Sequence, residues 1–106
     1  KWAAREAADA SSWEMADGPV VLSVVFLFIR PKSHYGTGKN SGVLKKDAPI
    51  YITRKPDLSK LIRSTEDALV DAGVIRDDSL IVEIAAFKRY GKNQGAQIWI
   101  GTLQNN

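Results

Sequence analysis

The apolar run from Val20 to Ile29, VVLSVVFLFI, constrains the fold of this chain more than any other stretch. β-Branched and aromatic side chains occupy both of its faces, interrupted by Ser23, and this pattern is typical of a strand covered on both sides. The run is far too short to cross a bilayer, and no charged segment with a cleavage site precedes it. We therefore expect neither a membrane anchor nor a signal peptide, and predict the central strand of a sheet.

The second strong signal is an amphipathic helix predicted from Asp57 to Ala72. Pro56 and Asp57 are typical of a helix start, with the Asp57 side chain capping free N–H groups, and Gly73 supplies a left-handed residue at the end. One face of this helix is expected to pack on the sheet. Its predicted buried stripe consists of Leu58, Leu61, Ile62, Thr65, Leu69 and Ala72.

Three weaker elements complete the predicted order. An alanine-rich helix is predicted from Trp2 to Met15, and because the chain opens in mid-helix we expect a leading segment before Lys1. The stretches Leu80–Tyr90 and Ala96–Leu103 have strand patterns, and the glycine-containing residues 91–95 between them predict a hairpin loop.

The order helix, strand, long loop, helix, strand, strand predicts an α+β fold. We expect one small domain spanning residues 1–106, with helices mainly on one face of the sheet. A chain of 106 residues can bury one core with little area to spare, which makes an obligate partner or a second copy plausible. Cysteine is absent and His34 is the one histidine, so disulfides and imidazole-built zinc sites are not expected. This composition suits a cytoplasmic protein.

Basic residues are concentrated in the middle of the chain. Between Arg30 and Arg63 there are nine basic and two acidic residues, whereas the rest of the chain has six basic and ten acidic residues. A concentrated basic surface is expected of a protein that meets a polyanion such as nucleic acid. The alternative is a solvated loop that is simply rich in lysine.

The centre of this basic region is a glycine-rich loop over residues 31–49. Its Tyr35–Asn40 stretch, YGTGKN, lacks the spacing and ending of a phosphate-binding loop, so we expect no nucleotide cofactor. A loop of this length is usually functional or disordered. The functional interpretation is a flap that grips a phosphate backbone. The candidate DNA-binding residues in and beside it are Lys32, Lys39, Lys45, Lys46, Arg54 and Lys55.

Carboxylates flank this basic segment at Asp57, Asp77 and Asp78. Hard divalent cations take such oxygen ligands and can activate water for phosphodiester hydrolysis, and Lys60 or Arg63 could orient the phosphate. Each residue also has an ordinary structural explanation. Asp57 is a typical helix cap, the Asp-Asp pair is typical of turns, and Arg63 could pair with an acidic residue one helical turn away.

The sequence resembles the RusA family of Holliday junction resolvases, which is widespread in phages and prophages. The resemblance is carried by KPDLSKLIRSTEDAL from Lys55 to Leu69, by AGVIRDDS from Ala72 to Ser79, and by Val82. It implies a homodimeric, magnesium-dependent endonuclease that cuts four-way DNA junctions by paired symmetric nicks. Mn²⁺ is a second possible cofactor, and the protein would act in the host cytoplasm.

Carried over by position, the resemblance places the first catalytic aspartate at Asp57 and the last at Asp78, with Asp77 beside it. The helix lysine of the family falls on Arg63, which keeps the charge but not the compact ammonium. The second aspartate of the signature falls on Ser59, whose neutral hydroxyl is a weaker ligand. This departure leaves open a natural variant compensated by Asp77, a catalytically poor junction binder, or an altered sequence.

The predicted helix also suggests how a dimer would form. It is about 24 Å long at about 1.5 Å per residue, so Asp57 and Asp78 start at opposite ends. We hypothesise that two such helices pack antiparallel across a two-fold axis, which would bring Asp57 of one chain near Asp78 of the other. Two functions from other classes stay open, namely a non-catalytic junction-binding module and an RNA-binding or RNA-processing protein.

Overall fold

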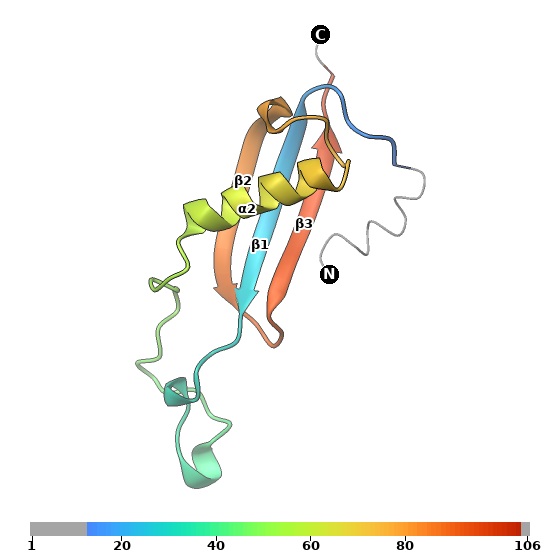
Figure 1. The fold of residues 1–106 in the computed structure, drawn as a ribbon. Helices are drawn as coiled ribbons and strands as arrows, with labels where there is room; N and C mark the ends of the chain where they lie inside the picture. The colour runs from blue at the N-terminus through green and yellow to red at the C-terminus, as the bar shows by residue number, and fades with distance from the viewer. Residues whose placement is uncertain (1–12, 105–106) are drawn as a thin grey trace.

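The computed structural model describes residues 13–104, and three strands within them form one mixed sheet. The strand order is β2-β1-β3, with β1 (Val20–Phe28) at the centre (Figure 1). β1 runs parallel to β2 (Ile81–Tyr90) and antiparallel to β3 (Gly95–Thr102). The prediction of a central strand is confirmed, and the described residues have an α+β fold.

The helix α2 (Leu58–Asp71) crosses one face of this sheet (Figure 1). It ends as predicted at Gly73, whose φ of 75° is in the left-handed region. The Val74 N–H donates to the Leu69 carbonyl at 2.9 Å and the Gly73 N–H to the Val70 carbonyl at 3.0 Å. These two bonds are the Schellman pattern, which satisfies carbonyls at the end of a helix.

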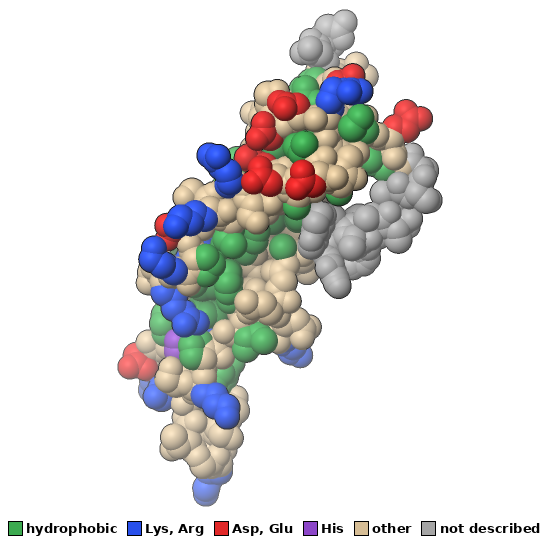
Figure 2. All heavy atoms as spheres, in the orientation of Figure 1, with side chains coloured by type: hydrophobic (Ala, Val, Ile, Leu, Met, Phe, Trp, Pro, Cys, Tyr) green, Lys and Arg blue, Asp and Glu red, His purple; other side chains and the backbone are tan. Residues whose placement is uncertain are grey.

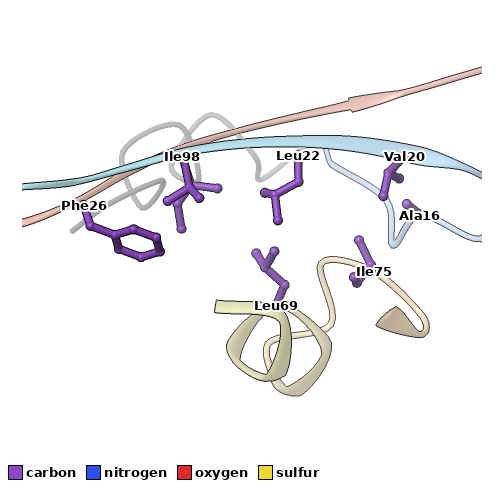
Figure 3. Packing of buried hydrophobic residues seen from close by; sticks show 8 residues of the cluster. Ala16, Val20, Leu22, Phe26, Leu69, Ile75 and Ile98 are labelled. Carbon is purple, nitrogen blue, oxygen red and sulfur yellow. The ribbon is translucent and has the colours of Figure 1, made fainter. Parts of the chain in front are cut away.

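The core lies between α2 and the sheet (Figure 3). Leu69 of α2 and Ile75 after it are each 1% exposed, and they face side chains that point down from the sheet. On β1 every second residue is buried, because successive side chains of a strand alternate between its faces. The buried sheet residues are Val20, Leu22, Val24, Phe26 and Ile98.

The hairpin predicted at residues 91–95 is wrong, because β1 lies between β2 and β3. The connection instead passes around the end of β1, where the Gly91 N–H donates to the Phe28 carbonyl at 2.9 Å. A Cβ on Gly91 would lie 3.1 Å from the Leu27 Cδ2, so the glycine permits this close passage. Local turn residues indicate a reversal of direction but not which strand becomes the neighbour.

Two further expectations need correction. Residues 13–15 are not helical, and the rest of the predicted first helix lies outside the described residues. Ala72 is exposed rather than part of the buried stripe, because it is the capping residue at the end of α2. On β1, α2 covers the face of the buried residues and the residues between them are half-buried, so cover on both sides stays a prediction.

The basic loop between β1 and α2 projects beyond the end of the sheet (Figure 1). It contains two short 3₁₀ turns, Lys32–His34 and Gly38–Asn40, and a bridge between Tyr35 and Leu44. Residues 50–53, which link the loop to the chain before α2, join no strand. Local hydrogen bonds therefore give the loop a fold of its own outside the sheet. Among the described residues, no helix is long and apolar enough to span a membrane.

Candidate functional site

Asp57 stands at the start of α2, at the N-cap position, as predicted. Its backbone carbonyl accepts from the N–H groups of Lys60 and Leu61, both at 3.1 Å. Its side chain makes no capping hydrogen bond, which corrects the expectation that the carboxylate caps the helix. The carboxylate is 48% exposed and has the Lys55 Nζ 3.8 Å from its Oδ1. Its oxygens are therefore accessible to a ligand.

The chain leading into α2 is held by Lys88, a residue that sequence reasoning missed. The Lys88 Nζ donates to the Arg54 carbonyl at 2.8 Å and to the Pro56 carbonyl at 2.9 Å. Lys88 lies on β2, on the face toward α2, because its register partner is the buried Phe26. The sequence signal that could have identified Lys88 is a lysine on an apolar strand at a position whose side chain faces the core. The two bonds fix the backbone immediately before Asp57.

The exposed side of α2 carries a depression of about 520 Å³. Its lining residues are Ser59, Lys60, Arg63, Ser64 and Asp67. The two cations predicted to orient a phosphate thus line one hollow, together with Ser59, which the resemblance aligns with an aspartate of the RusA signature. In the part of the chain that the structure describes, Arg63 makes no ion pair with Asp67. The guanidinium can therefore meet an anion.

Asp77 and Asp78 lie at the 3₁₀ turn η4 (Asp78–Leu80), directly before β2. The Asp77 Oδ2 accepts from the Ser79 N–H at 2.9 Å. Hydrogen bonds from the Ser79 side chain and backbone lower the pKa of Asp77, because they favour the charged carboxylate. Asp77 therefore has the turn role that was its ordinary structural explanation, while Asp78 is exposed within the turn.

The three predicted metal ligands do not gather in one place within the chain. Within residues 13–104, no group of three or more His, Cys, Asp or Glu side chains is arranged to hold a metal ion. The donor chemistry fits Mg²⁺ or Mn²⁺, since Asp57 and Asp78 offer exposed carboxylate oxygens. Their sharing between two subunits stays a prediction.

Charge is distributed unevenly over the molecule. Figure 2 shows most acidic side chains over the part that holds α2 and η4, and most Lys and Arg side chains toward the basic loop. All six predicted DNA-binding residues are exposed at the surface, consistent with contact to a polyanion. They are Lys32, Lys39, Lys45, Lys46, Arg54 and Lys55.

The base of the basic loop is fastened to the sheet by Arg30. Its Nη1 donates to the Pro49 carbonyl at 2.7 Å and lies 3.2 Å from the His34 Nδ1. Its guanidinium carbon also lies 4.2 Å from the centre of the Tyr90 ring, within the range of a cation–π contact. The contacts of Arg30 therefore hold the two ends of the loop close to the ends of β1 and β2.

Comparison with known proteins identifies the family. The family model described as "Endodeoxyribonuclease RusA" matches residues 1–101. No curated protein and no solved structure matches the chain. The match covers the basic loop, α2 and the Asp77-Asp78 turn. This chain belongs to the RusA family of endodeoxyribonucleases, the DNA-binding enzymes of recombination that resolve Holliday junctions.

Proposed function

We propose that this protein is a metal-dependent endonuclease that nicks Holliday junctions symmetrically as a homodimer. The observation that carries the proposal is the depression on α2. It brings Lys60 and Arg63 together one to two turns from Asp57, whose carboxylate is not used by the helix cap. Two cations beside an available carboxylate form an arrangement suited to a phosphodiester.

Lys60 and Arg63 are proposed to bind the scissile phosphate. Both side chains line the depression, so they can contact phosphate oxygens without leaving the surface of α2. The planar guanidinium of Arg63 can donate two parallel hydrogen bonds to a phosphate, and Lys60 adds a point charge. Lys88 keeps Asp57 in place beside them through the Arg54 and Pro56 carbonyls.

Asp57, Asp77 and Asp78 are proposed to hold Mg²⁺, with Mn²⁺ as a substitute. A divalent ion bound there would supply an activated water and neutralise charge on the phosphate. Asp77 keeps one oxygen on the Ser79 N–H and has a second oxygen to offer. The same hydrogen bonds hold Asp77 in the charged form that a metal requires.

The basic loop is proposed to grip the DNA backbone on either side of the branch. Lys39, Lys45 and Lys46 are exposed on the part that projects beyond the sheet, while Arg54 and Lys55 lie next to Asp57. Phosphate contacts of this kind position DNA without reading its sequence. A homodimer supplies two equivalent sites, which suits the two equivalent strands that must be cut.

A non-catalytic junction-binding module is the alternative, and Ser59 favours it. Ser59 lines the depression where the RusA signature has an aspartate, so a charged ligand is missing at that point. The basic loop would then bind the junction while the weakened metal site leaves the phosphodiester uncut.

A synthetic four-way junction distinguishes the two functions. We expect paired nicks with Mg²⁺ or Mn²⁺, and we expect Asp78→Asn to lose nicking by at least about 100-fold while keeping junction affinity. Asp71→Asn is the matched control, because Asp71 is an exposed aspartate at the far end of α2. Binding without cutting at every Mg²⁺ and Mn²⁺ concentration would support the module instead.

A further inference from the structure

Two neighbouring apolar side chains, Ile50 and Tyr51, stand out on the surface of the described chain. They are exposed to 74% and 77%, more than any other large hydrophobic residue that the structure describes. Neither belongs to the hydrophobic core beneath α2. Single exposed apolar residues are common, but an adjacent pair this exposed is a candidate contact for a partner.

The backbone that carries this pair is held on both sides. Before it, the Pro49 carbonyl accepts from the Arg30 Nη1 at 2.7 Å. After it, the Arg54 carbonyl accepts from the Lys88 Nζ at 2.8 Å. Ile52, directly after the pair, is buried. Ile50 and Tyr51 are therefore presented by a positioned segment, which lowers the entropy cost of using them in binding.

The surroundings of the pair are cationic. The stretch from Lys45 to Lys55 has four basic residues and one acidic residue, Asp47. On the face drawn in Figure 2, hydrophobic side chains lie among the Lys and Arg side chains toward the basic loop. Apolar and aromatic side chains between cations suit nucleic acid, whose bases offer flat apolar faces beside a charged backbone.

Selection of a branch requires a contact that plain duplex does not offer. Lysine and arginine contacts to phosphates are available along any duplex arm, so they position DNA without recognising a branch. At the crossover of a four-way junction, a base pair can lose its stacked neighbour and expose the face of a base. An aromatic ring can stack on that face, and an aliphatic side chain can wedge beside it.

The position of Tyr51 in the chain also fits such a contact. Six residues separate it from Asp57, so the two Cα atoms lie at most about 20 Å apart even along a fully extended chain. With about 3.4 Å between successive nucleotides of a strand, this is at most about six base steps. A base held by Tyr51 would therefore lie close to a phosphate held near Asp57.

We propose that Ile50 and Tyr51 recognise the branch of the junction. Tyr51 stacks on a base exposed at the crossover, and Ile50 wedges against the neighbouring base. The pair thus determines specificity for branched DNA, while the surrounding cations supply affinity for any DNA. The proposal rests on the junction nicking of the proposed function, but binding without metal tests it, so nicking is not needed for the readout.

Affinity for a four-way junction and for a duplex of the same arm sequence provides the first test. Tyr51→Ala should weaken junction binding about tenfold or more, through loss of stacking, and should change duplex binding less than about twofold. Tyr51→Trp should keep junction affinity within about threefold, because it retains an aromatic ring. Lys45→Ala should weaken both substrates by a similar factor. Trp99→Ala, at an exposed aromatic on β3, is the matched control and should change neither affinity.

Photocrosslinking locates the contact directly. A junction with 5-iodouracil at the crossover should crosslink to Tyr51, identified by mass spectrometry of the peptide, because the label reacts with an aromatic ring stacked on it. The same label in the middle of an arm should not crosslink there, and Tyr51→Ala should abolish the crosslink at the crossover. A crosshair residue elsewhere, such as Trp99, would overturn the proposal.

Failure of this proposal and failure of the proposed function give different results. Asp78→Asn should lose nicking but keep both the crosslink and the ratio of junction to duplex affinity. An unchanged ratio in Tyr51→Ala overturns branch recognition even where the parent protein nicks junctions. Altered self-association of Tyr51→Ala in sedimentation equilibrium without DNA would assign the pair to a protein contact and also overturn it. The variant should keep the parent's melting temperature, because Tyr51 is exposed.

Discussion

Ser59 is the residue on which we expect the level of the proposed nicking activity to depend most. It lies in the first turn of α2 and lines the depression with Lys60 and Arg63. We predict that Ser59→Asp lowers the Mg²⁺ concentration needed for half-maximal nicking by about tenfold or more, because a carboxylate binds a hard cation better than a hydroxyl does. Metal titration of junction cleavage measures this. Ser64→Asp adds the same charge to the same depression, and equal gains from both variants would show a general charge effect rather than a ligand.

Lys88 is expected to influence the proposed chemistry only through the backbone before Asp57, where it binds the Arg54 and Pro56 carbonyls. We predict that Lys88→Met lowers kcat for nicking about tenfold, because the Arg54 and Pro56 carbonyls lose their shared donor and the position of Asp57 loosens. Lys88→Arg should restore part of the loss. Lys92→Met, in the exposed connection between β2 and β3, is the matched control. A variant with unchanged kcat would mean that Asp57 is positioned without Lys88.

At the scale of one element, α2 depends on its C-terminal glycine. Gly73 has a φ of 75° with open space where a Cβ would lie, so an alanine there is strained by its backbone conformation alone. We predict that Gly73→Ala lowers the free energy of unfolding by about 1–2 kcal/mol, measured by urea denaturation. Gly42→Ala is the control, because Gly42 also has open space and its φ is not in the left-handed region. Equal losses from the two changes would contradict this account of the helix end.

At the scale of the whole molecule, the separation of charge predicts how binding responds to salt. Removing one lysine that neutralises a phosphate should reduce the slope of log K against log salt by about 0.9 for duplex arms. We therefore expect the double variant Lys45→Ala, Lys46→Ala to have a shallower slope, with affinity measured on a four-way junction. Arg76→Ala is the control, since Arg76 pairs with Asp17 away from the basic loop. An unchanged slope in the double variant would place the DNA elsewhere.

The sequence by itself determined the elements and the family. The apolar run of β1, the strand patterns of β2 and β3 and the helical pattern of α2 identify these elements, and Gly73 marks the end of α2, because these signals depend on local backbone preferences. The signature around Asp57 and the Asp77-Asp78 pair pointed to RusA, and the family match confirms it. The apolar residues on the face of β1 away from α2 were also visible in the sequence.

The tertiary structure alone decided how these elements meet. Strand order depends on pairings between distant segments, so the insertion of β1 between β2 and β3 could not follow from the turn at residues 91–95. The Asp57 carboxylate makes no capping hydrogen bond, and the Lys88 side chain binds the backbone before Asp57. Both features also depend on how distant segments of the chain pack together. Local sequence fixes what each segment can become, whereas the positions of side chains in a site depend on packing across the whole chain.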